Sequence, residues 1–200
     1  MAKKIILALI ILIIIAFSFI LLIDNNSVDI YIDGENVNVE THTLSDIDTK
    51  SLNENICDLT FDVMNDTTSN VTTLKEDVKT LCFDYGLEDV SVNVDSILGE
   101  DQIPVTIYVD GTSMLPTLKD GQSVLINKTH DVKIGDIVVA ESDEYGGIIK
   151  RVGDIQGDSI YLESDNKNIS YEYINGVLYE IKGITTWVDI SDINGVVIDY

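Results

Sequence analysis

The sequence is poor in basic residues, and this scarcity excludes one large class of partner. Its 200 residues include only 12 lysines and arginines against 35 acidic residues, so the formal net charge is −23. Nucleic-acid binding needs clustered basic side chains, and none are expected here. The surplus of carboxylates is most simply a solvated exterior, because no D-x-D-x-D-G series predicts a calcium loop.

Cysteine and histidine are also scarce, with two of each in the chain. Cys57 and Cys82 form no C-x-x-C motif, and the only histidines are His42 and His130, so a zinc site is not expected. In an oxidising compartment the two cysteines can form a disulfide. Two buried free thiols fit the sequence equally well, and both alternatives stay open.

Charge is absent altogether from residues 5–23, which read IILALIILIIIAFSFILLI. As a helix with a rise of ~1.5 Å per residue, this run spans roughly 28 Å, close to the ~30 Å hydrocarbon core of a bilayer. The alternative is a cleavable signal peptide, whose apolar region is usually ~7–15 residues long and ends at small residues. This run instead ends in Phe-Ile-Leu-Leu-Ile-Asp, so we predict an uncleaved transmembrane anchor.

The charges around this run predict its orientation. Lys3 and Lys4 precede it, while Asp24 and Asp29 follow it. The positive-inside rule then keeps residues 1–4 in the cytoplasm and places the chain after residue 23 outside the cell membrane. N-x-S/T sequons suit an exported domain, although they also arise by chance in a chain so rich in Asn and Thr. They begin at Asn25, Asn65, Asn70, Asn127 and Asn168.

Residues 24–102 predict a small α+β region of unknown role. Alternating apolar residues at 28–32 and 37–39 flank Asp33-Gly34, a pattern typical of a β-hairpin. Apolar residues then recur at helical spacing over residues 45–85, interrupted by a polar run, and Gly86 is a natural helix stop. We therefore expect a helical hairpin with one cysteine on each helix, followed by a strand at 90–94.

Residues 103–200 have the sequence pattern of an all-β domain. The predicted boundary between the α+β region and this domain lies near residues 99–104. Short alternating apolar runs are separated by Asp-Gly, Gly-Asp and Asn-Gly turns, which favours a strongly curved sheet. The expected strands lie near 105–109, 124–126, 137–139, 148–149, 160–162, 171–174, 177–184 and 196–198.

Two stretches of this half carry candidate chemistry. Residues 109–126 read VDGTSMLPTLKDGQSVLI, in which Gly111 permits close backbone approach, Ser113 follows a strand end and Pro116 fixes the next turn. A plain Gly-Ser turn between two strands is the simpler alternative. In the second stretch, strand alternation directs either Lys150 or Arg151 toward apolar neighbours. Burial lowers the pKa of a lysine, and a neutral amine can take a proton from a serine hydroxyl. A lysine reaching solvent from a sheet edge is the alternative.

Several short motifs follow one another in a fixed order in this half. V-x-G-x-S-M-x-P-T-L is followed by D-G, then G-D-I-V-V, then I-K-R-V-G-x-x-x-G-D. The order of these motifs resembles type I signal peptidases and the self-cleaving peptidase domain of LexA-like repressors. This resemblance covers residues 109–165 and implies a coiled β-sandwich or barrel fold, hence a mainly β chain with the anchor and the α+β region in front.

By this resemblance Ser113 is the nucleophile and Lys150 its general base. The Ser113 N–H helps to form the oxyanion hole, whereas Gly111 lacks the hydroxyl that some relatives place two residues before the serine. Met114 is expected beside the substrate groove. Further supporting residues implied by position are Asp165 and Asn166, although Ser164 replaces a family glycine, and Ser170, where the local match is poor. Histidine replaces the lysine in one branch of the family, and His130 is expected to be an ordinary surface loop residue.

The implied function is peptide-bond hydrolysis by a serine endopeptidase, without metal or organic cofactor, that removes signal peptides from exported preproteins. Its partners would be preprotein substrates and the lipid bilayer, through residues 5–23, and the site of action allows contact with the translocation machinery. Two alternatives remain. One is a catalytically idle scaffold or adaptor with the same fold, and the other is a peptidase dedicated to self-processing or to a few surface proteins.

Overall fold

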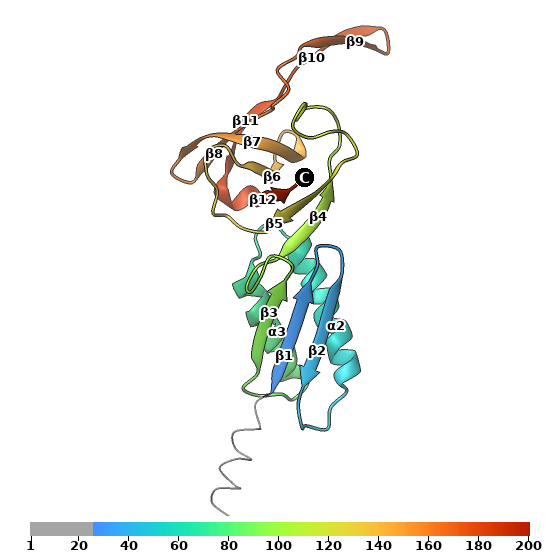
Figure 1. Cartoon of the computed structure of the whole chain (residues 1–200), viewed down its shortest axis with the longest axis vertical. Coiled ribbons are helices and arrows are strands. Elements are labelled where there is room, and N and C mark those ends of the chain that lie inside the picture. Colours follow the sequence, from blue (N-terminus) through green and yellow to red (C-terminus); the bar gives the residue numbers. More distant parts are fainter. Residues whose placement is uncertain (1–25) are drawn as a thin grey trace, which may run out of the picture.

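A computed structural model describes residues 26–200, which form an elongated molecule (Figure 1). The predicted anchor at 5–23 lies outside the described residues. So do the side chains of Ser170, Glu172, Ile174 and residues 179–181. Between residues 26 and 200, no helix is long and apolar enough to cross a membrane.

A three-stranded sheet begins the described chain. Strand β1 (Ser27–Ile32) lies in the middle, antiparallel to β2 (Val37–His42) and parallel to β3 (Ser91–Ser96). The predicted hairpin turn at Asp33-Gly34 is confirmed, since the Asp33 N–H donates to the Asn36 carbonyl. Alternate residues of β1 and β3 are buried because one face of the sheet is covered by helices.

The covering helices are α2 (Thr49–Asn65) and α3 (Val71–Asp84), which confirm the predicted helical hairpin. Asp48 caps α2 by accepting from the Ser51 N–H, and Asn70 caps α3 by accepting from Thr72 and Thr73. Beyond the last turn of α3, Gly86 has a φ of +85°, a conformation that glycine adopts at little cost. The apolar stripe of each helix packs against the sheet.

The two cysteines are free thiols in the structure, so the disulfide considered above is not formed. Cys82 is fully buried in the core, whereas the half-buried Cys57 thiol points to the Val37 carbonyl of β2. The two side chains therefore face different neighbours although their helices are adjacent. Burial raises the pKa of both thiols, which keeps them protonated.

The second half of the chain forms a curled seven-stranded sheet in the order β11-β8-β7-β6-β12-β5-β4. Its strands are β4 (Pro104–Tyr108), β5 (Ser123–Asn127), β6 (Ile137–Ser142), β7 (Gly146–Gln156), β8 (Ser159–Glu163), β11 (Thr185–Asp189) and β12 (Ile193–Asp199). A short 3₁₀ turn, η1 (Ile190–Asp192), precedes β12. Register shifts in β7 and β12 mark bulges, which bend a sheet, and the mainly β prediction is confirmed.

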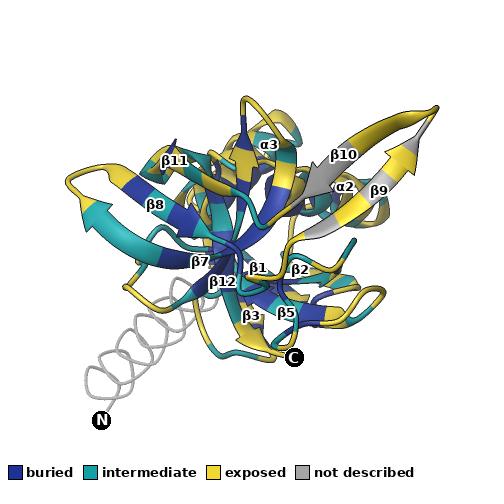
Figure 2. Ribbon diagram, turned by 90° about the horizontal axis from the view of Figure 1, so that it is seen from above, coloured by how far each residue is buried: buried dark blue, intermediate teal, exposed yellow. Residues whose placement is uncertain are grey.

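Strands β9 (Ser170–Ile174) and β10 (Val177–Ile181) form a separate two-stranded ribbon. It projects from the end of the molecule opposite to β1's first residue, and most of its described residues are exposed (Figures 1 and 2). The strand expected at 177–184 is present as β10, but it ends at Ile181 and not at residue 184. Around Gly183 the chain runs against Ser164 and the Asn166 carbonyl, so closely that a Cβ would lie 2.7 Å from that oxygen.

The two halves of the chain share one of three apolar clusters, in which Ile103, Val105 and Ile126 join the apolar residues of the helical region. Polar contacts reinforce this junction. The ammonium group of Lys128 donates to the Asp66 carbonyl and, at 2.9 Å, to Asn194 Oδ1. His130 lies on the loop after β5, as expected, where it is half-buried with Nε2 3.2 Å from the Thr67 carbonyl.

Candidate active site

Ser113 lies on the loop that follows β4, and hydrogen bonds join the two ends of this loop. The Val109 N–H donates to the Gln122 carbonyl, and the Gly121 N–H donates back to Val109. Gly111 has a φ of +86° and its N–H donates to Asp120 Oδ1 at 2.8 Å. A side chain at position 111 would be strained by that backbone conformation, although no atom blocks the space. The loop therefore presents Ser113 in a defined position.

Lys150 lies in the middle of β7 and is only 3% exposed. Its Nζ donates to Ser113 Oγ at 2.9 Å and to the neighbouring Ile149 carbonyl at 2.9 Å. Burial among apolar side chains lowers the pKa of Lys150 below 10.5. Strand alternation thus buries Lys150, as one of the two predicted arrangements requires, and Arg151 takes the more open face.

Ser113 and Lys150 open onto a groove of about 490 Å³. Its lining comes from residues of β4, of the serine loop, of β6 and of β7, together with Ile184. Five of the lining residues are aliphatic, Ile107 and Ile148 among them, while Tyr108, Tyr145 and Asp110 are exposed. The curl of the sheet is what brings β4 and β7 together, since three strands separate them in the sheet order.

Two strand edges border this groove. Of the described residues, Gly146 to Lys150 of β7 pair with β6 alone, because pairing with β8 begins at Arg151. Strand β4 pairs with β5, and on its other edge Thr106 donates to the Gly34 carbonyl. Free backbone groups at such edges can hydrogen-bond an extended peptide.

The backbone N–H of Ser113 is available as a donor, since no acceptor contacts it within residues 26–200. A backbone N–H beside a nucleophile can stabilise the oxyanion that forms during acyl transfer. Gly111 also lines the groove but has no side-chain donor to add, as the sequence indicates.

Asp165 and Asn166 form hydrogen bonds that stabilise the serine loop. The Asp165 carboxylate accepts from Arg151 Nε at 2.7 Å and Nη2 at 2.6 Å, and from the Thr117 hydroxyl at 2.5 Å. The Arg151 hydrogen bonds hold the pKa of Asp165 below 3.8. Asn166 donates to the carbonyls of Ser113 and Thr112. Sequence reasoning missed Arg151 and Thr117, although both stand inside the quoted motifs.

Two other expectations fare differently. Met114 is fully buried in an apolar cluster with Val109, Leu118 and Val124, and it does not line the groove, so its placement at the substrate groove was wrong. The loop turns at Ser113, which directs the next side chain into the core. The side chain of Ser170 lies outside the described part of the chain, so its supporting role stays a prediction.

Taken together, the groups at the groove are those that acyl transfer requires. A hydroxyl and a buried amine lie within hydrogen-bond reach, an unpaired N–H adjoins the hydroxyl, and strand edges flank both. This arrangement can activate a serine without a third side chain orienting the base, because the Ile149 carbonyl also holds Lys150 Nζ.

Known proteins share this part of the chain. The relatives include signal peptidase I of Bacillus licheniformis, 38% identical over 73 residues, which are 34% of this chain and 37% of the relative. Signal peptidase I U of Bacillus subtilis (strain 168) is 33% identical over 89 residues, and the match covers 38% of this chain and 48% of the relative. Signal peptidase IB of Staphylococcus aureus (strain N315) is 36% identical over 77 residues, and that match covers 36% of this chain and 38% of the relative.

The aligned part thus spans less than half the length of each of these relatives. The sequence model of the Peptidase S24-like family matches residues 87–186, which include the serine loop, Lys150 and the Arg151–Asp165 pair. Since this match covers half of the chain, the chain belongs to the Peptidase S24-like family and resembles type I signal peptidases.

Proposed function

We propose that this chain is a membrane-anchored serine endopeptidase, with Ser113 as nucleophile and Lys150 as general base. The observation that carries the proposal is the 2.9 Å contact between Lys150 Nζ and Ser113 Oγ, made by an amine that is almost wholly buried. A lysine in water is protonated at neutral pH and cannot accept a proton. Desolvation raises the neutral fraction and makes the amine a usable base.

The reaction begins when Ser113 Oγ attacks the scissile carbonyl carbon while its proton passes to Lys150 Nζ. The tetrahedral oxyanion accepts a hydrogen bond from the Ser113 N–H. Collapse breaks the C–N bond, and Lys150 returns the proton to the leaving amine. Water then attacks the ester, again losing a proton to Lys150, which releases the acid and restores the serine hydroxyl.

The substrates we propose are exported preproteins held at the same membrane. This proposal draws on the relatives, which are signal peptidases by name, and on the uncharged run at residues 5–23. Anchoring an enzyme and a leader peptide in one bilayer raises their effective concentration. The peptidase half would then lie on the extracytoplasmic side, because the basic residues precede the run.

Self-processing is less well supported than action on other chains. Asn26 precedes β1 at the end of the molecule opposite to the β9–β10 ribbon (Figure 1), and β1 is the central strand of its sheet. A bond near residue 26 therefore lies far from Ser113 of the same molecule. A catalytically idle scaffold is disfavoured because both Ser113 and Lys150 are present and in contact.

Cleavage of a preprotein by the full-length chain tests the proposal. Wild type, Ser113→Ala and Lys150→Met are compared on a preprotein with a small-residue leader junction, and the products are sequenced. We expect cleavage at one junction by wild type and a loss of about 10³-fold or more in both variants. Equal inactivity of all three chains would favour the scaffold, whereas cleavage by Lys150→Met at the wild-type rate would exclude Lys150 as base.

A further inference from the structure

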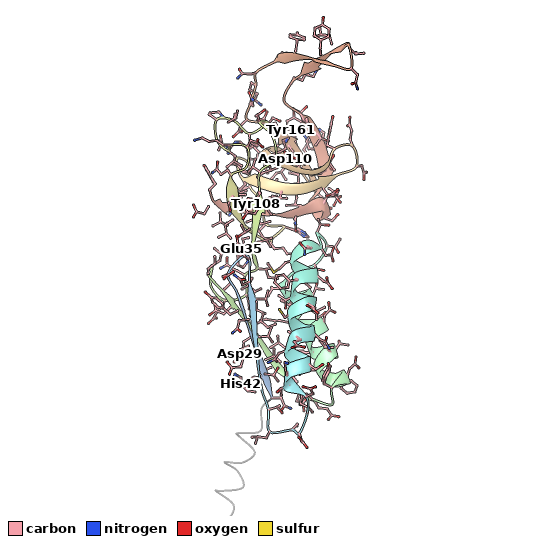
Figure 3. All side chains as sticks on the ribbon, turned by 90° about the vertical axis from the view of Figure 1, so that its right-hand side faces the viewer. Asp29, Glu35, His42, Tyr108, Asp110 and Tyr161 are labelled. Carbon is pink, nitrogen blue, oxygen red and sulfur yellow. The ribbon has the colours of Figure 1, made fainter. Side chains whose placement is uncertain are left out.

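The long axis of the molecule separates its membrane-proximal end from its active site. Figure 3 shows Asp29 and His42 at one end, Glu35 midway, and Tyr108 and Asp110, which line the groove, well beyond them. The start of β1 is also the point nearest in sequence to the predicted anchor. The α+β region therefore separates the start of β1 from Ser113.

The height of this spacer follows from the strands that build it. Strand β1 has 6 residues and rises roughly 20 Å at ~3.3 Å per residue. At its far end Gly34 accepts a hydrogen bond from Thr106 in the middle of β4, and the rest of β4 adds roughly 7 Å before the serine loop begins. Ser113 thus lies at least about 25 Å from the start of β1 along the long axis.

The spacer is fixed to the peptidase sheet at several points, so the separation cannot collapse. The shared core around Ile103 and Ile126 joins the two halves. The Thr106 N–H of β4 donates to the Gly34 carbonyl at 2.8 Å, while the ammonium group of Lys128 reaches the turn between α2 and α3. These contacts lie at separate points of the junction and together resist bending there.

Charge opposes the alternative in which the molecule lies flat on the membrane. The open face of the three-stranded sheet carries Asp29, Glu40 and Asp95. The helical face on the opposite side carries acidic residues as well, at Asp58, Asp62, Asp77 and Asp84. Either face would press carboxylates against the bilayer, an arrangement that the cost of desolvating charged groups disfavours.

We infer that the α+β region is a rigid spacer that selects substrates whose scissile bond lies well away from the bilayer. This inference rests on the proposed function and names its substrate class. A stretch of about 25 Å needs about eight residues of extended chain at ~3.4 Å each. The preferred substrates are therefore membrane-held polypeptides with at least about eight residues between the membrane and the cleaved bond. A leader cut directly after its apolar segment cannot reach Ser113.

The test uses the full-length chain in liposomes with a series of substrates. Each substrate has one membrane-spanning segment, a Gly-Ser linker of about 3, 6, 9, 12 or 15 residues, and the same Ala-x-Ala junction. A soluble peptide with that junction is the control for activity itself, and Ser113→Ala is the inactive control. We expect cleavage to be at least about tenfold slower for the two shortest linkers than for the longest, because engagement fails when a linker cannot span the sites.

A matched enzyme variant carries a flexible Gly-Ser insertion of about ten residues between positions 24 and 25. It should cleave the short-linker substrates nearly as fast as the long ones, with cleavage of the soluble peptide unchanged. Equal rates for all linkers with the wild-type chain would overturn the spacer. So would a maximum at the shortest linker, which would mean that the exposed β9–β10 ribbon, with Tyr173 and Leu178, contacts the bilayer instead. If wild type fails to cleave the soluble peptide, the proposed function itself fails, and the inference with it.

Discussion

The backbone N–H of Asn166 donates a 2.9 Å hydrogen bond to the carbonyl oxygen of Ser113, and its side-chain amide donates another, also 2.9 Å, to the Thr112 carbonyl. The segment after β8 therefore holds the serine loop at the residue that carries the nucleophile. Asn166 forms no hydrogen bond with Ser113 Oγ or Lys150 Nζ, so its role is to position the loop.

Replacing Asn166 with alanine should lower kcat by about 10-fold to 100-fold while changing KM little, because the loop loses a side-chain tether but the groove stays intact. Steady-state kinetics on a soluble junction peptide measure both constants. Asn168→Ala is the matched control, since Asn168 is exposed and only its backbone N–H contacts Asn166. An Asn166→Ala variant with wild-type kcat would show that the backbone bond suffices.

The pH dependence of activity should follow Lys150. Burial lowers its pKa below 10.5, and only the neutral amine accepts the Ser113 proton, so kcat/KM should rise as pH increases through this lowered pKa. A pH–rate profile on the soluble peptide gives the apparent value. A rate that stays constant, or falls, as pH rises from about 6 to about 10 would contradict a lysine base.

Local patterns in the sequence predicted much of the architecture. The Asp33-Gly34 hairpin, the two apolar helical stripes and the stop at Gly86 each depend on residues close together in the chain, and all three were confirmed. The contact between Ser113 and Lys150 was reached through the order of several motifs rather than from spacing alone. The physics of either stretch alone left a plain turn and a surface lysine as alternatives.

What escaped prediction depends on contacts between distant segments. Strand β11, Thr185–Asp189, carries exposed Trp187 and alternates weakly, and it exists because β8 pairs with it. The Arg151–Asp165 ion pair and the contact of Lys128 with the α2–α3 turn join elements whose proximity only the folded chain establishes. Met114 was misplaced because a motif gives the neighbours of a serine but not the direction in which the backbone turns.

The Arg151–Asp165 pair should make the free energy of unfolding depend on pH in the acid range. Arg151 hydrogen bonds hold the pKa of Asp165 below 3.8, so the stabilisation is fully present above pH 3.8 and is lost as pH falls through the lowered pKa. Asp165→Asn should reduce the free energy of unfolding by about 1–3 kcal/mol at neutral pH, with a smaller difference from wild type near pH ~3. Urea unfolding measures both values, and the exposed Asp143→Asn serves as control. A difference that stays constant at both pH values would contradict the assignment.

Lys128 should be the strongest single link between the helical region and the peptidase sheet. It is 7% exposed, and its ammonium group donates hydrogen bonds to the Asp66 carbonyl and to Asn194 Oδ1. Lys128→Met should cost about 2–4 kcal/mol of unfolding free energy, because both hydrogen bonds of the buried ammonium group are lost, while the exposed Lys79→Met should change little.

The same variant isolates a second pH effect, which lies at alkaline pH and has the same sign as that of Asp165. Burial lowers the pKa of Lys128 to about 8, so between about 8 and 10.5 the unfolded chain binds the proton that the folded chain releases. The stability of wild type relative to Lys128→Met should therefore rise with pH across this window. Urea unfolding of both chains at pH ~7 and ~10 measures the change. A relative stability that falls over the same interval would mean that the folded protein keeps Lys128 charged through its two oxygen partners.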